Sequence, residues 1–248
     1  MTKITKIILG GLVFGVAVSS AISASQEDLF ISNAKKQHQT MMDSIKAVSK
    51  VKASKKDEFI KINQKYLDEF TQSYEVLTSE EKTQIVSSTL TKALNPNEFE
   101  KELTQTFVTI GMELGKMKAE GKEVAEKDVR DEFENKGAKK LFEKLYSTKE
   151  TLEEYYKMAF DLVELLEKQE DPKHKEKAAN FKKEIDGCIK WYLGNAKVTA
   201  TLTEEATIVL LTNQFNQTSE EIAKNMVEAT KVVTKMCKGD NAIKVENK

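Results

Sequence analysis

The residue types that most often carry chemistry are few in this chain, and they lie far apart. There are two cysteines, Cys188 and Cys237, and two histidines, His38 and His174. Neither cysteine lies in a Cys-x-x-Cys motif, and neither histidine has a ligand neighbour at Glu-x-x-His or His-x-x-x-His spacing. These spacings indicate no redox or zinc site, and we expect both histidines to be structural or solvated.

Catalysis could still depend on a pair of carboxylates, as it does in glycosidases. The chain has 40 acidic residues, and no spacing singles out two of them. It also lacks a glycine-rich phosphate loop, a Gly-x-Ser-x-Gly elbow and a nucleotide fingerprint. We therefore assign no catalytic residue, no cofactor and no metal, and a carboxylate-based enzyme remains the least favoured of the functions considered.

The two cysteines are candidates for a disulfide. Both fall on apolar stripes of predicted helices near the C-terminal end, and antiparallel neighbours would bring the two sulfur atoms within bonding reach. Exported proteins commonly hold an even number of cysteines as disulfides, whereas separate buried thiols are the alternative. The sequence favours a bond between Cys188 and Cys237.

The first 25 residues have the three parts of a secretory signal peptide. Lys3 and Lys6 precede an apolar run over residues 7–18, and small residues follow at 19–25. The run is too short for a transmembrane helix, which needs about 20 apolar residues. We expect cleavage near residues 23–25, a secreted or periplasmic product, and no transmembrane span in the mature chain.

The charges are unevenly distributed along the chain. Residues 33–65 carry nine lysines against three acidic residues, although the whole chain has a net charge of −1. Such a segment can contact an anionic surface, or it can lie beside acidic neighbours or face water. The candidates for anionic contact are Lys50, Lys52, Lys55 and Lys56. Arg130 is the only arginine, and specific nucleic-acid recognition usually depends on arginine, so we expect none.

Apolar residues recur every three or four positions through most of the chain, which predicts an all-α protein. We expect about eight helices, packed as an antiparallel bundle or as stacked helical hairpins. The helical domain spans residues 26–239, with a sub-boundary near residue 171, and residues 240–248 form a polar tail. Helix starts are predicted from side-chain caps at Ser54–Asp57, Thr78–Glu81, Ser147–Glu150, Asp171–Pro172 and Thr218–Glu221.

These features together favour a non-catalytic, exported helical protein that binds another macromolecule, either a protein or an anionic surface. The alternative is a carrier that holds a small apolar ligand between its helices, since the chain has 11 phenylalanines and eight methionines. The sequence specifies neither the partner nor the oligomeric state.

Overall fold

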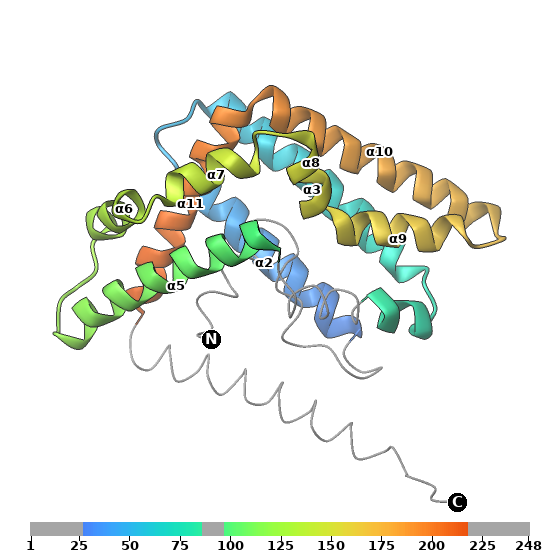
Figure 1. Cartoon of the computed structure of the whole chain (residues 1–248). Coiled ribbons are helices and arrows are strands. Elements are labelled where there is room, and N and C mark those ends of the chain that lie inside the picture. The colour runs from blue at the N-terminus through green and yellow to red at the C-terminus, as the bar shows by residue number, and fades with distance from the viewer. Residues whose placement is uncertain (1–26, 86–96, 218–248) are drawn as a thin grey trace, which may run out of the picture.

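The described part of the chain is helical throughout. The computed structural model describes residues 27–85 and 97–217, which form α-helices joined by short turns, with no β-strand among them (Figure 1). Residues 79–85 are helical, and the bounds of the other helices are α2 (Glu27–Ala47), α3 (Ala53–Glu75), α5 (Glu98–Ala119), α6 (Glu126–Asn135), α7 (Ala138–Leu145), α8 (Lys149–Tyr155), α9 (Lys157–Glu167), α10 (Pro172–Gly194) and α11 (Ala196–Phe215). The all-α prediction is confirmed. The predicted signal peptide, the start at Thr218–Glu221 and the polar tail lie outside the described residues.

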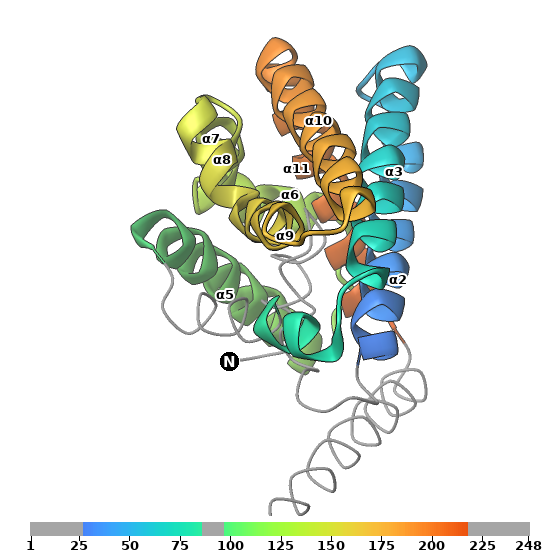
Figure 2. The ribbon, with the colours of Figure 1, turned by 90° about the vertical axis from the view of Figure 1, so that its right-hand side faces the viewer.

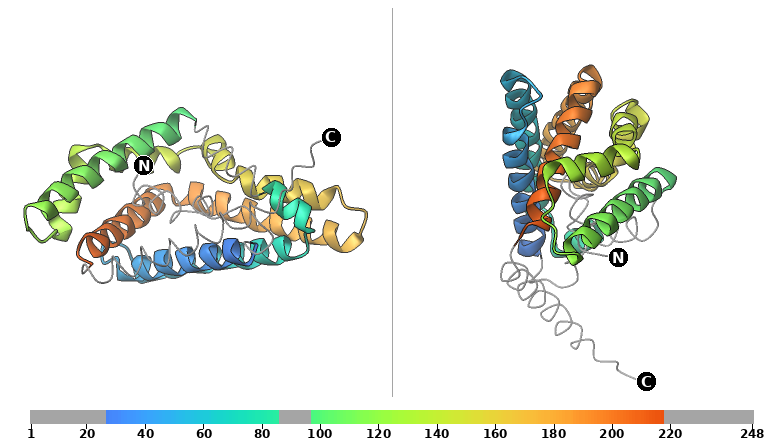
Figure 3. Two further views of the ribbon diagram at one scale, coloured as in Figure 1. Left: turned by 90° about the horizontal axis from the view of Figure 1, so that it is seen from below. Right: turned by 90° about the vertical axis from the view of Figure 1, so that its left-hand side faces the viewer.

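The helices stack in three layers (Figures 2 and 3). Helices α2 and α3 form an antiparallel hairpin at one edge, and α10 and α11 form the middle layer. Helix α3 packs on α10, while α2 packs on α11. On the other side, α9 packs on α10, and α6 and α7 pack on α11. The middle layer is therefore covered on both sides, whereas one side of α2 and α3 is covered by no other described helix.

Several helix ends lie where the sequence predicts them. Thr78 and Glu81 form reciprocal capping hydrogen bonds, in which each side chain accepts from the backbone N–H of the other. Asp171 caps α10, since its carboxylate accepts from the N–H of Lys173 at 2.8 Å. Gly121 follows the end of α5 with a φ of +77°, which an L side chain adopts only with strain.

Two of the predicted caps are wrong. Ser54 lies inside α3, which begins after Lys52 without any side-chain cap. Ser147 is one residue too early, because Thr148 occupies the N-cap position of α8 and accepts from the N–H of Thr151. Adjacent serine and threonine offer equivalent hydroxyl groups, so the pattern alone does not decide between them.

The chain after Thr148 forms two consecutive helices, α8 and α9, which are divided at Tyr156. A straight helix points successive side chains in different directions, about 100° apart. The break lets the neighbouring rings of Tyr155 and Tyr156 meet edge to face at 5.6 Å, with both hydroxyl groups in the interior. This division adds a helix, and the described residues hold more helices than the eight predicted.

Helix α11 lies in the middle of the molecule and is buried on nearly all sides. Residues 198–202 are rich in valine and threonine, which favour strands, yet they lie inside this helix. Thr199, Thr203 and Thr207 each donate a hydroxyl hydrogen bond to the carbonyl four residues earlier. These bonds satisfy buried hydroxyl groups inside the helix, so packing overrides the local preference for a strand. None of the helices in the described ranges combines enough length and hydropathy to cross a bilayer.

Candidate functional site

The lysine-rich segment predicted from the sequence forms most of the α2–α3 hairpin. Lys50 lies in the turn between the two helices, and its Nζ donates to Oε1 of Glu205 on α11 at 2.8 Å. Glu205 is almost completely buried, with 9% of its side chain exposed. Lys50 is therefore a structural cation that joins the turn to the middle layer, and this role makes it less available for a partner.

Two of the other candidate lysines also have partners within the molecule. Lys55 pairs with Glu58 at 2.7 Å, and its ammonium group lies 5.9 Å from the centre of the Trp191 ring. Lys56 donates to the carbonyls of Lys46 and Val48, at 3.0 and 2.7 Å. These carbonyls are among those left without partners at the end of α2, so Lys56 caps that helix and complements its dipole.

Six lysines of residues 33–65 remain. Lys46 pairs with Asp43 at 2.9 Å, and the other five are exposed and make no ion pair with any described residue. We define the hairpin face as the five lysines Lys35, Lys36, Lys52, Lys61 and Lys65, which come from α2, from the position before α3 and from α3 itself. Lys52 is the only residue of the four sequence candidates that belongs to this set. The structure thus separates lysines that hold the fold together from lysines that make no ion pair with a described residue.

Acidic residues also lie on this outer layer, and their positions limit the positive region. Asp57 and Glu58 lie near the start of α3. Its second half holds one lysine, Lys65, and three acidic residues, Asp68, Glu69 and Glu75. The burial of His38 of α2, beside Asn63 and Asp68 of α3, shows that the middle of α2 is level with this part of α3. Lys35 and Lys36 precede His38 and lie toward the open end of the hairpin, whereas Lys52 lies at the turn. The five lysines are therefore spread along the hairpin.

Glu205 is the centre of a second charged group that sequence analysis missed. Arg130 on α6 forms a bidentate pair with it, with Nη1–Oε1 and Nη2–Oε2 distances of 2.5 and 2.7 Å. The same guanidinium reaches Glu126 at 2.9 Å. Burial alone would raise the pKa of Glu205, but the hydrogen bonds from Arg130 and Lys50 outweigh it and hold this pKa below 4.5. The cluster joins α6, α11 and the α2–α3 turn.

One sequence signal could have identified this cluster. Glu205 stands directly before a run of small and apolar residues at 206–211, where a solvated carboxylate is not expected. The adjacent Glu204 has its pKa raised by burial, which Lys139 and other cations only partly offset. The only arginine of the chain is thus committed to a buried carboxylate, and its fork is not free for a phosphate or carboxylate of a partner.

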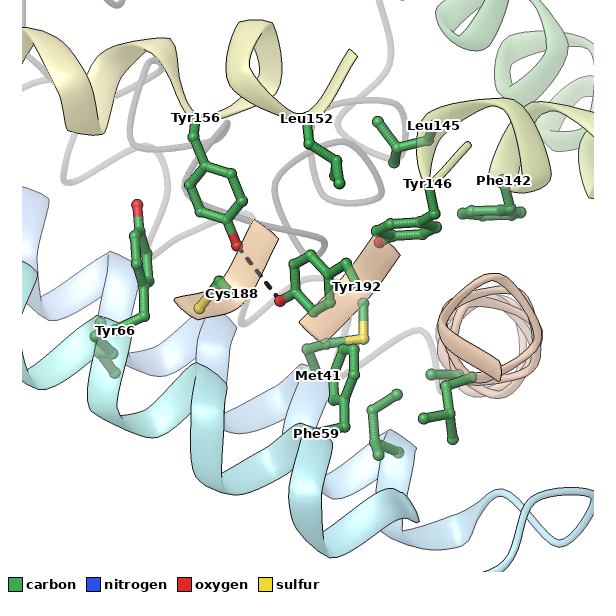
Figure 4. Packing of buried hydrophobic residues seen from close by; sticks show 14 of the residues in the cluster. Met41, Phe59, Tyr66, Phe142, Leu145, Tyr146, Leu152, Tyr156, Cys188 and Tyr192 are labelled. Atoms are coloured by element: carbon green, nitrogen blue, oxygen red, sulfur yellow. Dashed lines mark hydrogen bonds between the residues drawn. The ribbon is translucent and has the colours of Figure 1, made fainter. Parts of the chain in front are cut away.

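The interior between α3, α8, α9 and α10 is a cluster of aromatic rings (Figure 4). Tyr192 donates to Oδ1 of Asn63 at 2.7 Å and accepts a longer hydrogen bond of 3.4 Å from Tyr156. Tyr66 meets Tyr156 edge to face at 5.2 Å, and Tyr146 meets Tyr192 at 5.5 Å. Most of these rings are therefore interior: Tyr192 and Tyr156 are buried, while Trp191 and Tyr155 are only partly covered.

Cys188 lies within this aromatic cluster and is the only cysteine among the described residues. Its Sγ lies 3.8 Å from the carbonyl oxygen of Ile62, and burial raises the pKa of the thiol to about 12. The described residues contain no disulfide. Cys237 lies outside the described residues, so its pairing with Cys188 stays a prediction. A thiol with this pKa is almost entirely protonated at neutral pH and is a poor nucleophile.

The two histidines lie apart in the fold. His38 is on α2, and burial lowers its pKa despite the opposing effects of the Asn63 backbone and the Asp68 carboxylate. His174 is in the first turn of α10. Within residues 27–85 and 97–217, no three side chains of histidine, cysteine, aspartate or glutamate come together as metal ligands.

Comparison with known proteins adds no constraint to this geometry. No protein-family model, no curated protein and no solved structure matches the chain.

Proposed function

We propose that this is a non-catalytic, exported binding protein that contacts an anionic macromolecule through the hairpin face. The observation that carries the proposal is the set of five exposed lysines on one outer layer that have no ion pair within the described structure. Unpaired cations at a surface raise the local concentration of anionic partners and speed their association. The α2–α3 hairpin is one of the two outer layers, and within the described residues one of its sides is left for a partner.

The test uses lysines whose removal leaves the described hydrogen bonds intact. Lys35, Lys36, Lys61 and Lys65 are replaced together by glutamine, which removes four charges but keeps a long polar side chain. Lys50, Lys55 and Lys56 are kept, because their replacement would also break the contacts with Glu205, with Glu58 and Trp191, and with the end of α2. Circular dichroism should show an unchanged helix content.

The matched control replaces four exposed lysines outside the hairpin, Lys127, Lys140, Lys182 and Lys183, so that the net charge changes equally. Retention on immobilised heparin, a general anionic probe, is measured as the salt concentration needed for elution. The hairpin variant should elute at clearly lower salt than the native protein, and the control should stay close to native. Equal elution of the two variants would show that net charge, and not the hairpin face, governs the binding.

Export is tested separately on the cellular product. The mass of the mature protein recovered from outside the cytoplasm should correspond to cleavage near residues 23–25. Recovery of the full-length chain in the cytoplasmic fraction alone would contradict the proposed location.

A further inference from the structure

We infer that residues 218–239, which lie outside the described residues, dock as a helix on an open face of α5 in the same molecule. Helix α5 lies at the edge of the molecule opposite to the α2–α3 hairpin, so this docking does not involve the hairpin face (Figures 2 and 3). We call the open face the α5 stripe and define it by four uncharged residues: Thr104, Val108, Met112 and Gly115. Successive helical residues are turned by about 100°, which places these four on one side of α5, next to its buried side.

The described helices that pack on α5 cover a different side of it. Phe107, on the buried side, meets Phe133 of α6 and Phe142 of α7, with ring centres 5.6 and 6.0 Å apart. Met112 of the α5 stripe is 60% exposed, more than any other large hydrophobic residue in the described ranges. A Cβ atom placed on Gly115 would have no described neighbour within 4 Å. The α5 stripe is therefore an apolar surface with room for a further helix.

The chain reaches this part of the molecule at a fixed point. Asn216, directly after α11, donates from Nδ2 to the carbonyl of Val124 at 2.6 Å and accepts at Oδ1 from the N–H of Val124 at 3.2 Å. The same Oδ1 accepts from Nζ of Lys118, in the last turn of α5, at 3.3 Å. Residue 218 therefore starts beside the C-terminal end of α5. From there a segment can follow α5 only if it runs antiparallel to it.

Residues 218–239 have the pattern and the length that the α5 stripe requires. The sequence predicts a helix that starts at the Thr218–Glu221 cap and presents four apolar residues on one side: Ile222, Met226, Val233 and Cys237. Most of the stability of an amphipathic helix comes from packing of its apolar side, so this side needs a cover. The 22 residues of α5 match the length of the segment. A rise of about 1.5 Å per residue places Cys237 about 28 Å beyond residue 218, level with the first turn of α5.

The charges at the helix ends favour the same antiparallel orientation. In α5 the first turn is acidic and the last turn is basic, with Glu98 and Glu100 at the start and Lys116 and Lys118 at the end. The segment has the same order, with Glu220 and Glu221 near its start and Lys235 and Lys238 near its end. Antiparallel docking therefore places unlike charges beside each other at both ends, and it brings opposite ends of the two helix dipoles together.

A second copy of the chain is a less favourable occupant than the segment. Only Gln217 separates the segment from Asn216, whose side chain is hydrogen-bonded at the end of α5. So short a connection keeps the effective concentration of the segment at the α5 stripe at roughly millimolar or above. A second copy at micromolar concentration cannot compete with it.

The experiment uses the native thiol of Cys237 as the probe in the mature protein. Lys101→Cys introduces a thiol in the first turn of α5, on the side of the α5 stripe. Lys116→Cys is the matched control in the last turn, because each lysine is exposed and pairs with a glutamate three residues earlier. After mild oxidation at micromolar concentration, disulfide-linked peptides are quantified by mass spectrometry. The bond to Cys237 should form at least about tenfold faster in Lys101→Cys than in the control, because docking holds Cys237 about 25 Å from position 116.

A second measurement tests the α5 stripe itself. Met112→Asp places a charge in the stripe, whereas Thr109→Asp adds the same charge on the other flank of α5. Cleavage of a docked segment follows the population of its open form, so Met112→Asp should speed trypsin cleavage after Lys231 and Lys235 roughly tenfold or more. Thr109→Asp should leave the rate of cleavage close to that of the native protein.

Four results would overturn the inference. Equal rates of bond formation in the two cysteine variants would show that the segment is not docked. The disulfide between Cys188 and Cys237, as the main product, would place the end of the segment at the aromatic cluster instead. Disulfide-linked dimers would make a second copy the occupant, and equal cleavage of the two aspartate variants would exclude the α5 stripe. No hairpin lysine is changed in these experiments, so the function proposed above is tested independently.

Discussion

Replacement of Arg130 by leucine should destabilise the fold more than the loss of any exposed ion pair. Removing one partner of a buried salt bridge costs about 3–5 kcal/mol when the other charge is left uncompensated. Glu205 would keep Lys50 at 2.8 Å, and the Arg130 side chain is 30% exposed, so the cost should lie nearer 2–3 kcal/mol. At this chain length that corresponds to a fall in Tm of about 5–10 °C. Urea unfolding followed by circular dichroism measures the free energy directly.

Two further variants make this prediction refutable. The double replacement of Arg130 and Glu205 by leucine should recover most of the lost stability, because it removes the buried charge along with its partner. Lys101→Gln removes an exposed pair with Glu98 and should change the free energy of unfolding by less than about 1 kcal/mol. An Arg130→Leu protein as stable as the native protein would show that the cluster does not hold the helices together. The same conclusion would follow if the double variant lost as much free energy of unfolding as the two single variants together.

The same cluster predicts a pH dependence with a definite sign. Because the pKa of Glu205 is lower in the folded state than its ordinary value of 4.5, the carboxylate stabilises the fold above that value. This stabilisation is lost as the pH falls through the lower, folded-state pKa. The stability difference between native protein and Glu205→Gln should therefore be constant near neutral pH and shrink below about pH 4.5. A difference that grew on acidification would contradict the argument.

The remaining predictions concern the interior and the turns. In a Cys237→Ser protein, Cys188 should resist alkylation by iodoacetamide at pH 8 until denaturant is added, since burial raises the pKa of its thiol to about 12. Mass spectrometry measures the labelling, and rapid labelling of the native fold would refute this prediction. Gly137→Ala should lower the free energy of unfolding by about 1–2 kcal/mol, because φ is +70° at this position. Gly187→Ala, inside α10 with equally open space, should raise it by about 0.5–1 kcal/mol. Unfolding curves in which both changes have the same sign would show that backbone conformation does not cause these effects. Asn63→Ala should cost about 1–3 kcal/mol in the same assay, because the buried Tyr192 hydroxyl group loses its acceptor. An unchanged stability would mean that another acceptor replaces the Asn63 side chain.

The sequence predicted the helical class and many helix ends because both depend on local patterns. Apolar residues at intervals of three and four gave the faces that are buried, including Val129 and Phe133 on the short helix α6. Thr78 and Asp171 cap their helices through side chains only a few residues away. Such signals need no knowledge of the partner helices.

What the sequence did not predict depends on contacts between distant parts of the chain. The β-prone start of α11 is helical because neighbours cover it on both sides, and the break at Tyr156 is fixed by the ring cluster of α3 and α10. The functions of Lys50 and Lys56 likewise follow from acceptors that lie 155 and eight residues away. Only the assembled fold shows which lysines are occupied and which are free.

The position of α10 and α11 also has a consequence for how the chain is made. These two helices are among the last described parts to leave the ribosome, yet they fill the centre against which α2 and α3 pack. Until residue 172 and those after it emerge, α2 and α3 lack the helices on which they pack most extensively. The core around α2 and α3 is therefore completed only after most of the described chain has been synthesised.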